Sequence, residues 1–509
     1  MNQHPLNDAM SPRPLAARWV IRGTLTLETA LHLGGEAGEQ VDMPVLRDAR
    51  DGRPLLPGTT LAGALRSALA DRLAGYEEPE PPEVAALFGG AAQGDDDGSQ
   101  SPLIVFDALG EIPPGHGVEI RDGVAISALT GTAEDHKKYD YEVLPAGTTF
   151  AVRADLLLPA PASRDGATPP DEKSLLEALA AALDAFAHGQ SAFGAKRSRG
   201  LGRVSAVWAA RRFDLGSAKG WVEWTLSDHE RPFAANPDQS CIRDALEQAA
   251  PEALRPLELP GDRRDRVVID VDLRVAHDIL VRSPGTDPAA PDVSHLHSGG
   301  TAILPGTSLA GVMRTQALRI ATLVRAGRDE AELWVDRLFG PRFEGQRPSG
   351  KLKPRAARIR VDEARFEGSQ PQRQTRVAID RFTQGVVDTA LFDEQMEVGG
   401  RATARLELRN PEKGELGLVL LVLKDLLDGS LPVGGTSSVG RGVLRGMASV
   451  TWHEGDRTAP RSAKIQPGRQ PAGEAAGEID EAIRAFHQAD SLASTPSEAG
   501  AAMSAEGAS

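Results

Sequence analysis

The 509-residue sequence is poor in several residue types that define common protein classes. It contains one cysteine, Cys241, which excludes a disulfide framework and a cysteine-rich zinc site and fits a reducing, cytoplasmic location. No apolar run is long enough to cross a membrane, and the first residues lack the apolar core of a signal peptide. Aromatic residues make up only 4%, which argues against a surface that binds bases by stacking several rings.

The net charge of −15 argues at first against a nucleic-acid partner, but the charge is unevenly distributed. Residues 76–98 carry seven acids and no Lys or Arg, and residues 471–509 carry seven acids and one Arg. Residues 340–384 carry eleven Lys or Arg against five acids. A local basic face is what backbone phosphates require, and the average over the chain hides it. A window of this length could also be basic by chance.

Two parts of the chain repeat the same markers in the same order. The segment 56–66 reads LPGTTLAGALR, and the segment 304–314 reads LPGTSLAGVMR. The other shared markers are Leu87-Phe88-Gly89 and Leu338-Phe339-Gly340, Tyr139-Asp140 and Phe392-Asp393, and the glycine-rich stretches 194–202 and 434–442. Such a repeat predicts two copies of one structural module.

The repeat predicts four regions. The first module covers 18–210, a linker covers 211–264, and the second module covers 265–453. Residues 454–509 are rich in Ala, Gly, Ser and acids, so they are expected to be largely disordered, with room for a short helix near 479–486.

The secondary-structure pattern is the same in both copies. Each opens with an alternating strand, 19–27 or 267–275, followed by a Pro-Gly turn and a helix that Thr60 or Ser308 could cap. A later helix is expected at 174–188 or 414–428, and a glycine-rich loop and a strand close the copy. Two strand–helix units with added hairpins indicate an α+β fold of two tandem, ferredoxin-like modules.

The glycine-rich segments are candidate phosphate contacts. The segment from Gly58 to Gly63 has the spacing of half a P-loop, but the required Lys-Ser/Thr is absent from both copies, which argues against nucleotide hydrolysis. A helix start with free N–H groups still suits a polymer phosphate, and the candidates there are Gly58, Thr59, Gly306 and Thr307. The alternative is that Pro-Gly only makes a tight entry to the helix.

The second glycine-rich loop of the first copy is basic. Lys196, Arg197, Arg199 and Arg203 could neutralise phosphates there. The second copy keeps the glycines and loses most of the charge. The glycines are therefore expected to be structural in both copies, and the basic contact to be stronger in the first.

The opening strand, the Leu-Pro-Gly-Thr-Ser-Leu-like helix start and the C-terminal glycine-rich loop resemble the RAMP superfamily of CRISPR-associated proteins. Two copies in one chain resemble the double-module backbone subunit of some type III-D effector complexes. The resemblance implies RRM-like (RAMP) modules that bind guide RNA along a positive groove, pair with complementary target RNA, and assemble with other subunits. It also implies a protruding β-hairpin, the thumb, in each module.

The segments 124–156 and 377–408 lie where the resemblance places the thumbs. Lys137 and Lys138 would lie near the first tip, and Arg373, Arg376 and Arg381 flank the base of the second. All five are candidate RNA contacts. An ordinary surface hairpin is the alternative for each segment.

In the family, an Asp in the loop after the first strand cuts target RNA with a divalent metal. The resemblance places Asp42 in that role, and Asp292 matches it if a two-residue deletion precedes the Pro-Gly turn of the second copy. Both are therefore candidate catalytic residues and ligands of a divalent metal, with Mg²⁺ expected. Most loop aspartates are, however, solvated turn residues.

Other functions stay open at this point. His295 and His297 would share a face of an extended segment and could act as acid/base groups or metal ligands. The chain could be a target-cleaving endoribonuclease subunit, a non-catalytic guide-RNA scaffold, or an enzyme that processes guide RNA alone. The low overall charge and the duplication disfavour the last.

Overall fold

The computed structural model describes most of the two repeated copies. The described residues are 15–36, 41–90, 100–127, 130–160, 171–187, 189, 191–228, 241–284, 290–324, 327–341, 343–344, 347–348, 355–412, 414–455 and 459–489. Residues 161–170, which are rich in Pro and Ala, and the end of the C-terminal tail, from 490 onward, lie outside these residues.

The first module is built on one sheet with helices packed against it. The strand order is β2-β4-β7-β1-β8, with β3 also paired to β7. These strands are β1 (Leu15–Leu27), β2 (Leu55–Leu56), β3 (Leu103–Val105), β4 (Ala108–Glu111), β7 (Thr149–Pro159) and β8 (Val204–Asp214). The helices are α1 (Gly58–Ala74), α2 (Pro82–Phe88) and α3 (Glu172–Ala187), followed by the 3₁₀ turn η2 (Arg197–Arg199).

The second module repeats this plan. Its main sheet has the order β17-β21-β9-β22-β23. The strands are β9 (Asp265–Val275), β17 (Ile359–Val361), β21 (Arg401–Arg409), β22 (Leu444–Glu454) and β23 (Arg461–Ile465). The helices are α6 (Gly306–Val324), α7 (Arg328–Phe339), α8 (Glu415–Asp428) and α9 (Ala476–Gln488), with the 3₁₀ turn η4 (Ser437–Val439) before β22.

Small strands surround the main sheet of the second module. A further sheet joins β10 (Asp278–Ile279), β11 (Arg282–Pro284), β12 (Val293–His295) and two hairpin arms, β19 (Gln370–Ile379) and β20 (Val386–Val398). The remaining short pairs involve β13 (His297–Ser298), β14 (Thr301–Leu304), β18 (Ala364–Arg365), β15 (Phe343–Glu344) and β16 (Arg347–Pro348).

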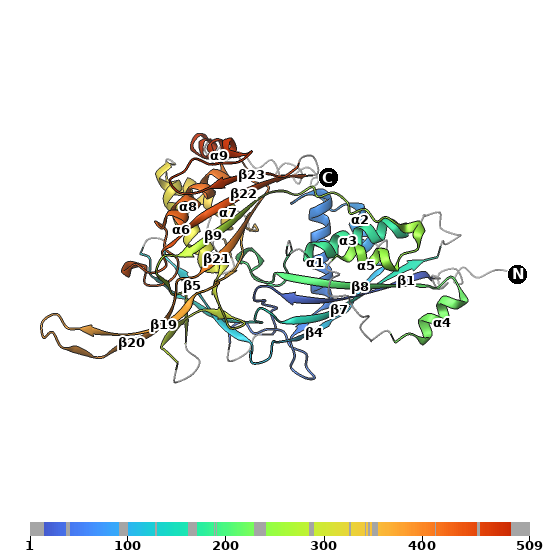
Figure 1. Ribbon diagram of the computed structural model, residues 1–509, viewed down its shortest axis with the longest axis horizontal. Helices are drawn as coiled ribbons and strands as arrows, with labels where there is room; N and C mark the ends of the chain where they lie inside the picture. Colours follow the sequence, from blue (N-terminus) through green and yellow to red (C-terminus); the bar gives the residue numbers. More distant parts are fainter. Residues whose placement is uncertain are drawn as a thin grey trace, which may run out of the picture.

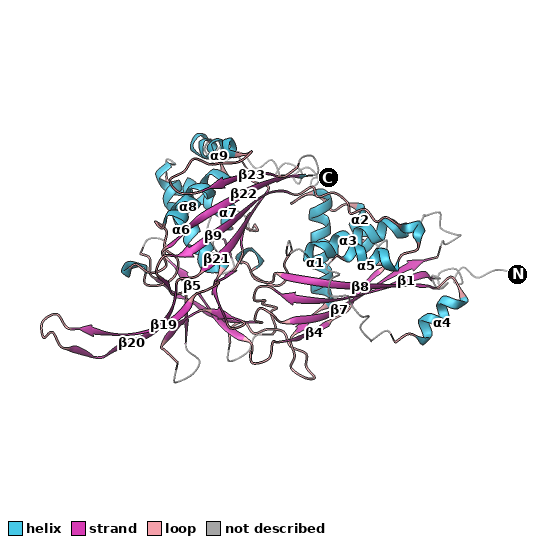
Figure 2. Cartoon of the chain, viewed as in Figure 1, coloured by secondary structure: helices cyan, strands magenta, loops and turns pink. Residues whose placement is uncertain are grey.

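Each module follows a β–α–β–β–α–β order in which the first strand lies between the last two long strands. In the first module β1 pairs antiparallel with both β7 and β8, and in the second β9 pairs antiparallel with both β21 and β22. The helices named above lie on one face of their sheets (Figures 1 and 2), and a further helix over 218–226 packs on the opposite face of the first sheet, with Trp224 against Val20 and Phe213. The chain is therefore α+β, as its sequence predicts, and the helices expected at 174–188 and 414–428 are confirmed as α3 and α8.

Each module has its own apolar core because its helices bury their apolar sides against its own sheet. One core runs from Ala17 to Leu257 and the other from Val267 to Phe486. The first core includes buried Ile242 and Leu246 of α5 (Ile242–Ala249), which falls in the expected linker. The rest of that segment contains α4 (Ala218–Leu226) and the 3₁₀ turn η3 (Glu252–Leu254).

The expectation of a largely disordered tail after 454 is wrong for residues 459–489. Strand β23 pairs with β22, and Ile479 and Phe486 of α9 are buried in the second core. The helix expected near 479–486 is part of α9. The acidic composition suggested disorder, but α9 is amphipathic. Its buried apolar residues, Ile479 and Phe486, lie on one face that packs against the core.

A long hairpin interrupts each module between its second and third strands. The arms are β5 (Glu119–Ile126) with β6 (Ala133–Val143), and β19 (Gln370–Ile379) with β20 (Val386–Val398). Figure 1 shows β19 and β20 projecting away from the second module. Both hairpins begin and end earlier than the segments 124–156 and 377–408 expected from sequence. Their ends differ because residues 149–159 and 401–409 are long strands of the main sheets.

The two modules contact each other through buried polar groups. The Arg121 guanidinium, at the base of the first hairpin, lies 2.5 Å from the Glu363 carboxylate, and both side chains are buried. The Tyr76 hydroxyl lies 3.2 Å from Glu407 across the same boundary. Burial raises the pKa of Tyr76 to about 12, so it stays protonated and donates this bond.

Candidate nucleic-acid interface

Asp42 lies at the base of the first hairpin. Its side chain is exposed, and its Oδ2 accepts a hydrogen bond of 3.1 Å from the backbone N–H of Asp140 on β6. The backbone N–H of Asp42 in turn donates to Asp140 Oδ1 at 2.8 Å. This reciprocal pair of bonds fixes the Asp42 loop to the hairpin and brings two carboxylates together.

Asp292 has the same place in the second module. It is exposed, and its Oδ2 accepts a bond of 3.0 Å from the backbone N–H of Asp393 on β20. The Asp393 carboxylate, however, pairs with Arg373, and this pairing lowers the Asp393 pKa below its usual range. The second site therefore places a cation beside its carboxylates. In the first site, Asp140 bonds to the Asp42 backbone instead.

The register of the two loops establishes that Asp42 and Asp292 are equivalent. Leu46 donates its N–H to the Leu33 carbonyl at 2.8 Å, and Leu296 donates to the Val281 carbonyl at 2.9 Å. Each aspartate stands four residues before its leucine. The two-residue shortening in the second copy lies after this leucine, because Pro57 follows Leu46 by 11 positions and Pro305 follows Leu296 by 9.

Metal-binding capacity at these positions is limited to pairs of carboxylates. Among the described residues, no group of three or more His, Cys, Asp or Glu is placed to hold a metal ion. Mg²⁺ commonly uses only one or two protein carboxylates and takes its other ligands from substrate phosphates and water. The Asp42 and Asp292 positions fit that donor set when RNA phosphates are present.

His295 does not have the geometry of an exposed acid/base group. It is buried, its Nδ1 accepts from the Val281 N–H at 3.1 Å, and its Nε2 lies 2.9 Å from the Ile303 carbonyl. Burial lowers the pKa of His295 to about 4, so it is neutral near pH 7. His297 is partly exposed, with its Nε2 3.3 Å from Glu397.

A groove lies between the Asp42 loop, α1 and the glycine-rich loop of the first module. Its volume is about 450 Å³. Thr60 and Ser67 line it from α1, His32 and Gly34 from the loop after β1, and Phe193, Gly194 and Arg197 from the glycine-rich loop. The fold thus brings two of the segments that the repeat marks, the start of α1 and the glycine-rich loop, together with the loop after β1.

The argument for a free helix start fails at Gly58. Gly58 is buried, its N–H donates to Asp107 Oδ1 at 2.7 Å, and a Cβ here would lie 2.2 Å from the Val105 carbonyl oxygen. Asp107, rather than Thr60, caps α1, which begins at Gly58. Thr59 is exposed, so its side chain remains accessible.

The start of α6 is covered by the other module. A Cβ on Gly306 would lie 2.3 Å from the Arg199 carbonyl oxygen and 2.3 Å from that of Val361. The glycine is therefore required for contact between modules, and it is not accessible to a phosphate. Thr307 beside it is exposed.

The four basic residues of the first glycine-rich loop have different surroundings. Arg203 pairs with Glu28 at 2.8 Å and with Asp362 of the second module at 3.0 Å. Arg199 is mostly buried and donates to the Phe339 carbonyl at 3.3 Å. These two arginines join the modules, because their partners lie across the boundary or beside it.

Lys196 and Arg197 face the groove and the hairpin base. The Lys196 Nζ lies 2.6 Å from the Tyr139 hydroxyl and 3.8 Å from the centre of the Tyr141 ring. Arg197 is exposed, and its pKa is lowered by partial burial and by the nearby cations of Arg409 and Arg360. Asp71 is the carboxylate whose charge acts on Arg197, and its effect on the Arg197 pKa is smaller than that of burial and of the two arginines.

The candidate contacts on the hairpins are mostly exposed. Lys137 and Lys138 are exposed on β6, and Lys138 lies 3.1 Å from Asp122. In the second hairpin, Arg373 pairs with Asp393, Arg376 lies 3.7 Å from Glu394, and the Arg381 guanidinium lies 4.5 Å from the Phe382 ring centre. Phe382 and Ile379 are 79% and 64% exposed, which gives this hairpin an apolar tip that the sequence analysis missed.

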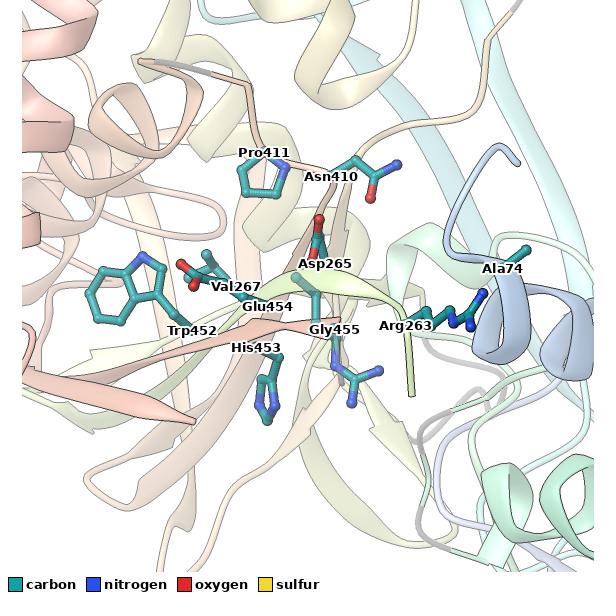
Figure 3. Close-up of a pocket in the computed structure, with 11 residues that line it drawn as sticks. Ala74, Arg263, Asp265, Val267, Asn410, Pro411, Trp452, His453, Glu454 and Gly455 are labelled. Atoms are coloured by element: carbon teal, nitrogen blue, oxygen red, sulfur yellow. The ribbon is translucent and has the colours of Figure 1, made fainter. Parts of the chain in front are cut away.

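A larger cavity, of about 1080 Å³, lies where the end of α1 meets the second sheet (Figure 3). Arg263 and Arg266 line it together with Asp265, Glu454 and His453. Positive and negative side chains are therefore mixed in this cavity, and they do not favour a ligand of either charge. No helix among the described residues combines the length and apolar character needed to span a bilayer.

Comparison with known proteins gives the class of the chain. A model of the RAMP superfamily matches residues 24–205 and 284–445, which together make up more than half of the sequence. The chain therefore belongs to the RAMP superfamily, and it contains two RAMP regions.

A curated relative is the CRISPR system Cms endoribonuclease Csm3 of Enterococcus italicus. It is 33% identical to this chain over 84 residues, a match that covers 14% of this chain and 39% of that protein. The alignment thus spans less than two thirds of the relative.

Proposed function

We propose that this chain is a backbone subunit of a type III CRISPR ribonucleoprotein, of the III-D kind with two fused modules. It binds guide RNA and cleaves complementary target RNA. The β–α–β–β–α–β order supports a ferredoxin-like assignment for each module, and the family match and the Csm3-like segment support the RNA chemistry.

The observation that carries the proposal is the matched placement of Asp42 and Asp292. Each is an exposed carboxylate in the loop after the first strand, and each is held by a backbone N–H from the base of its hairpin. A hairpin that enters a guide–target duplex would therefore present one carboxylate to the target backbone at each module. The double module predicts two cuts at a regular spacing.

Asp42 and Asp292 would each align a target ribose so that its 2′-hydroxyl attacks the adjacent phosphorus in line. The bond to the 5′-oxygen of the next nucleotide then breaks, leaving a 2′,3′-cyclic phosphate and a 5′-hydroxyl. Mg²⁺, when bound beside the same carboxylate, neutralises charge on the phosphate. The exposed Lys137, Lys138 and Arg381 and the half-buried Arg376 would contact RNA phosphates along the hairpins.

The test is target cleavage by the complex reconstituted with guide RNA, using Asp42→Ala, Asp292→Ala and the double variant. Each single variant is expected to lose its own cut while target binding is unchanged, and the double variant to lose both. Survival of all cuts in the double variant would make this chain a guide-RNA scaffold.

A further inference from the structure

His32 is a buried polar residue that the proposed cleavage does not use. It is 1% exposed and lines the 450 Å³ groove of the first module. Its Nδ1 lies 2.7 Å from the backbone carbonyl oxygen of Glu142. A carbonyl oxygen can only accept, so Nδ1 carries the proton and donates.

The other ring nitrogen of His32 is consequently a hydrogen-bond acceptor. In the neutral ring, a proton on Nδ1 leaves a lone pair on Nε2. Nε2 is buried and has no hydrogen-bond partner among the described residues. It points away from Glu142 and toward Gly34, where a Cβ would lie 3.7 Å from it, and Gly34 also lines the groove.

An unpaired buried acceptor disfavours the ligand-free state, so a ligand donor that reaches Nε2 would be bound favourably. Thr60 and the exposed guanidinium of Arg197 line the same groove, and two further arginines, Arg409 and Arg360, outweigh the charge of Asp71 near it. A guanidinium suits a phosphate, whereas an aromatic nitrogen acceptor cannot bind one, because phosphate oxygens at neutral pH are themselves acceptors. The groove therefore offers one contact for an anion and one for a neutral donor.

We propose that His32 reads the ribose 2′-hydroxyl of a guide nucleotide whose phosphate lies on Arg197. This inference rests on the proposed guide-RNA binding and names the chemistry of one subsite. A guide varies in sequence, so its binding site needs a donor that every nucleotide carries. The 2′-hydroxyl is the hydrogen-bond donor common to all ribonucleotides and absent from DNA.

The second module lacks this pair of groups. The loop bonds that align the copies put Leu280 at the His32 position, since Ala195 donates to the His32 carbonyl and Gly435 donates to the Leu280 carbonyl. Ser437, the first residue of η4, stands where Arg197 begins η2. The subsite is accordingly specific to the first module. The residues of the second module at these two positions, leucine and serine, supply the substitutions for the test.

The experiment measures binding of the full chain to fluorescent single-stranded RNA and to DNA of the same sequence. His32→Leu is expected to weaken RNA binding about fivefold, the effect of one lost neutral hydrogen bond, and to leave DNA binding unchanged. Arg197→Ser is the control. It is expected to weaken both ligands equally and to reduce the salt dependence by about one phosphate contact.

An equal effect of His32→Leu on RNA and DNA, or no effect on either, would overturn the inference while leaving guide-RNA binding intact. Failure of the wild-type chain to bind RNA at all would instead overturn the proposed function. If His32→Leu does not fold, wild-type protein is titrated with RNAs that carry one 2′-deoxy position at a time. We then expect one 2′-deoxy position to lower the affinity for RNA about fivefold. Equal affinity for all RNAs in the series would contradict the assignment.

Discussion

The two modules make the same contact between hairpin base and glycine-rich loop with opposite chemistry. In the first module Tyr141 and Leu201 pack together in a small apolar cluster with Ala30. In the second, the Arg441 guanidinium lies 2.7 Å from Glu394 and 3.3 Å from Asp278.

These positions are equivalent by their backbone bonds. Gly202 donates to the Ala30 carbonyl as Gly442 donates to the Asp278 carbonyl. Three residues have therefore changed together, from an apolar set to an ionic set. The lesson is that the fold requires the loop to be fixed to the hairpin, and either chemistry achieves this.

A second comparison concerns the free and covered forms of the same loop. A Cβ on Gly200 would lie 2.2 Å from the Glu363 N of the second module, whereas a Cβ on Gly440 would meet nothing within 4 Å among the described residues. The first loop is thus a contact between modules, and the second is an open surface. Its residue Val439 is 62% exposed, where the first loop has the mostly buried Arg199.

The largest effect is expected from breaking the ionic set. Arg441→Leu removes the buried cation between Asp278 and Glu394 and leaves Glu394 only the longer contacts with Arg376 and Arg282, which should lower the free energy of unfolding by about 3 kcal/mol. The triple variant with Asp278→Ala, Glu394→Tyr and Arg441→Leu installs the set of the first module and should recover most of the loss. Urea denaturation measures both, and a triple variant no more stable than the single one would contradict the comparison.

A pH-dependent difference is expected at His295, which replaces Val45 of the first module. The unfolded chain binds a proton here near pH 6.5, and the folded chain binds it only near pH 4. Between these values the unfolded state holds more protons, so the free energy of unfolding falls as the pH falls, by up to about 3 kcal/mol.

His295→Val should remove that slope and bring the second module to the behaviour of the first at this position. Thermal unfolding of both proteins across this pH range gives the measurement. Parallel stability curves for wild type and variant would show that His295 does not titrate as its burial requires.

Alanine substitutions at Gly200 and Gly440 distinguish the destabilisation caused by a collision between modules from that caused by backbone strain. Gly200 and Gly440 have φ of +85° and +89°, so alanine at either position should cost about 1 kcal/mol. Gly200→Ala should cost measurably more, because its Cβ would collide with the backbone at Glu363. Equal losses on urea denaturation would mean that the second module moves aside freely.

The smallest effect concerns the carboxylates beside Asp292. The Arg373 cation holds the pKa of Asp393 below its usual range, and removal of Arg373 should raise it. NMR titration of the Asp393 carboxyl carbon in Arg373→Ala measures the change. Arg376→Ala is the control, since Arg376 lies near Glu394 instead, and it should leave the Asp393 titration as in the wild type.

The local pattern of the sequence carried much of the fold. Alternating residues gave the opening strands, and helical spacing after the Pro-Gly turns gave α1 and α6. The repeat predicted one shared module in two copies. The match between Asp42 and Asp292 came from the family resemblance, with a two-residue deletion before the second Pro-Gly turn.

The local pattern of the sequence did not predict which residues far apart in the chain form ion pairs. The high proportion of Lys and Arg in residues 340–384 predicted a free positive surface. Arg355 instead pairs with Glu77 at 2.7 Å, and Arg358 pairs with Glu415 at 3.1 Å. Part of the acidic stretch 76–98 is likewise a set of partners, as Glu80 pairs with Arg66 at 2.6 Å. Charge counts along a sequence do not distinguish a paired arginine from a free one.

The sequence by itself determined that there are two modules of one kind, their α+β class, and where their loops fall. Only the tertiary structure decided which glycines serve packing, with Gly58 and Gly306 buried, and which cation of the basic loop faces a groove, namely Arg197. The physical reason is that strand and helix patterns arise from neighbours in the chain. Accessibility and charge pairing depend on groups that only folding brings together.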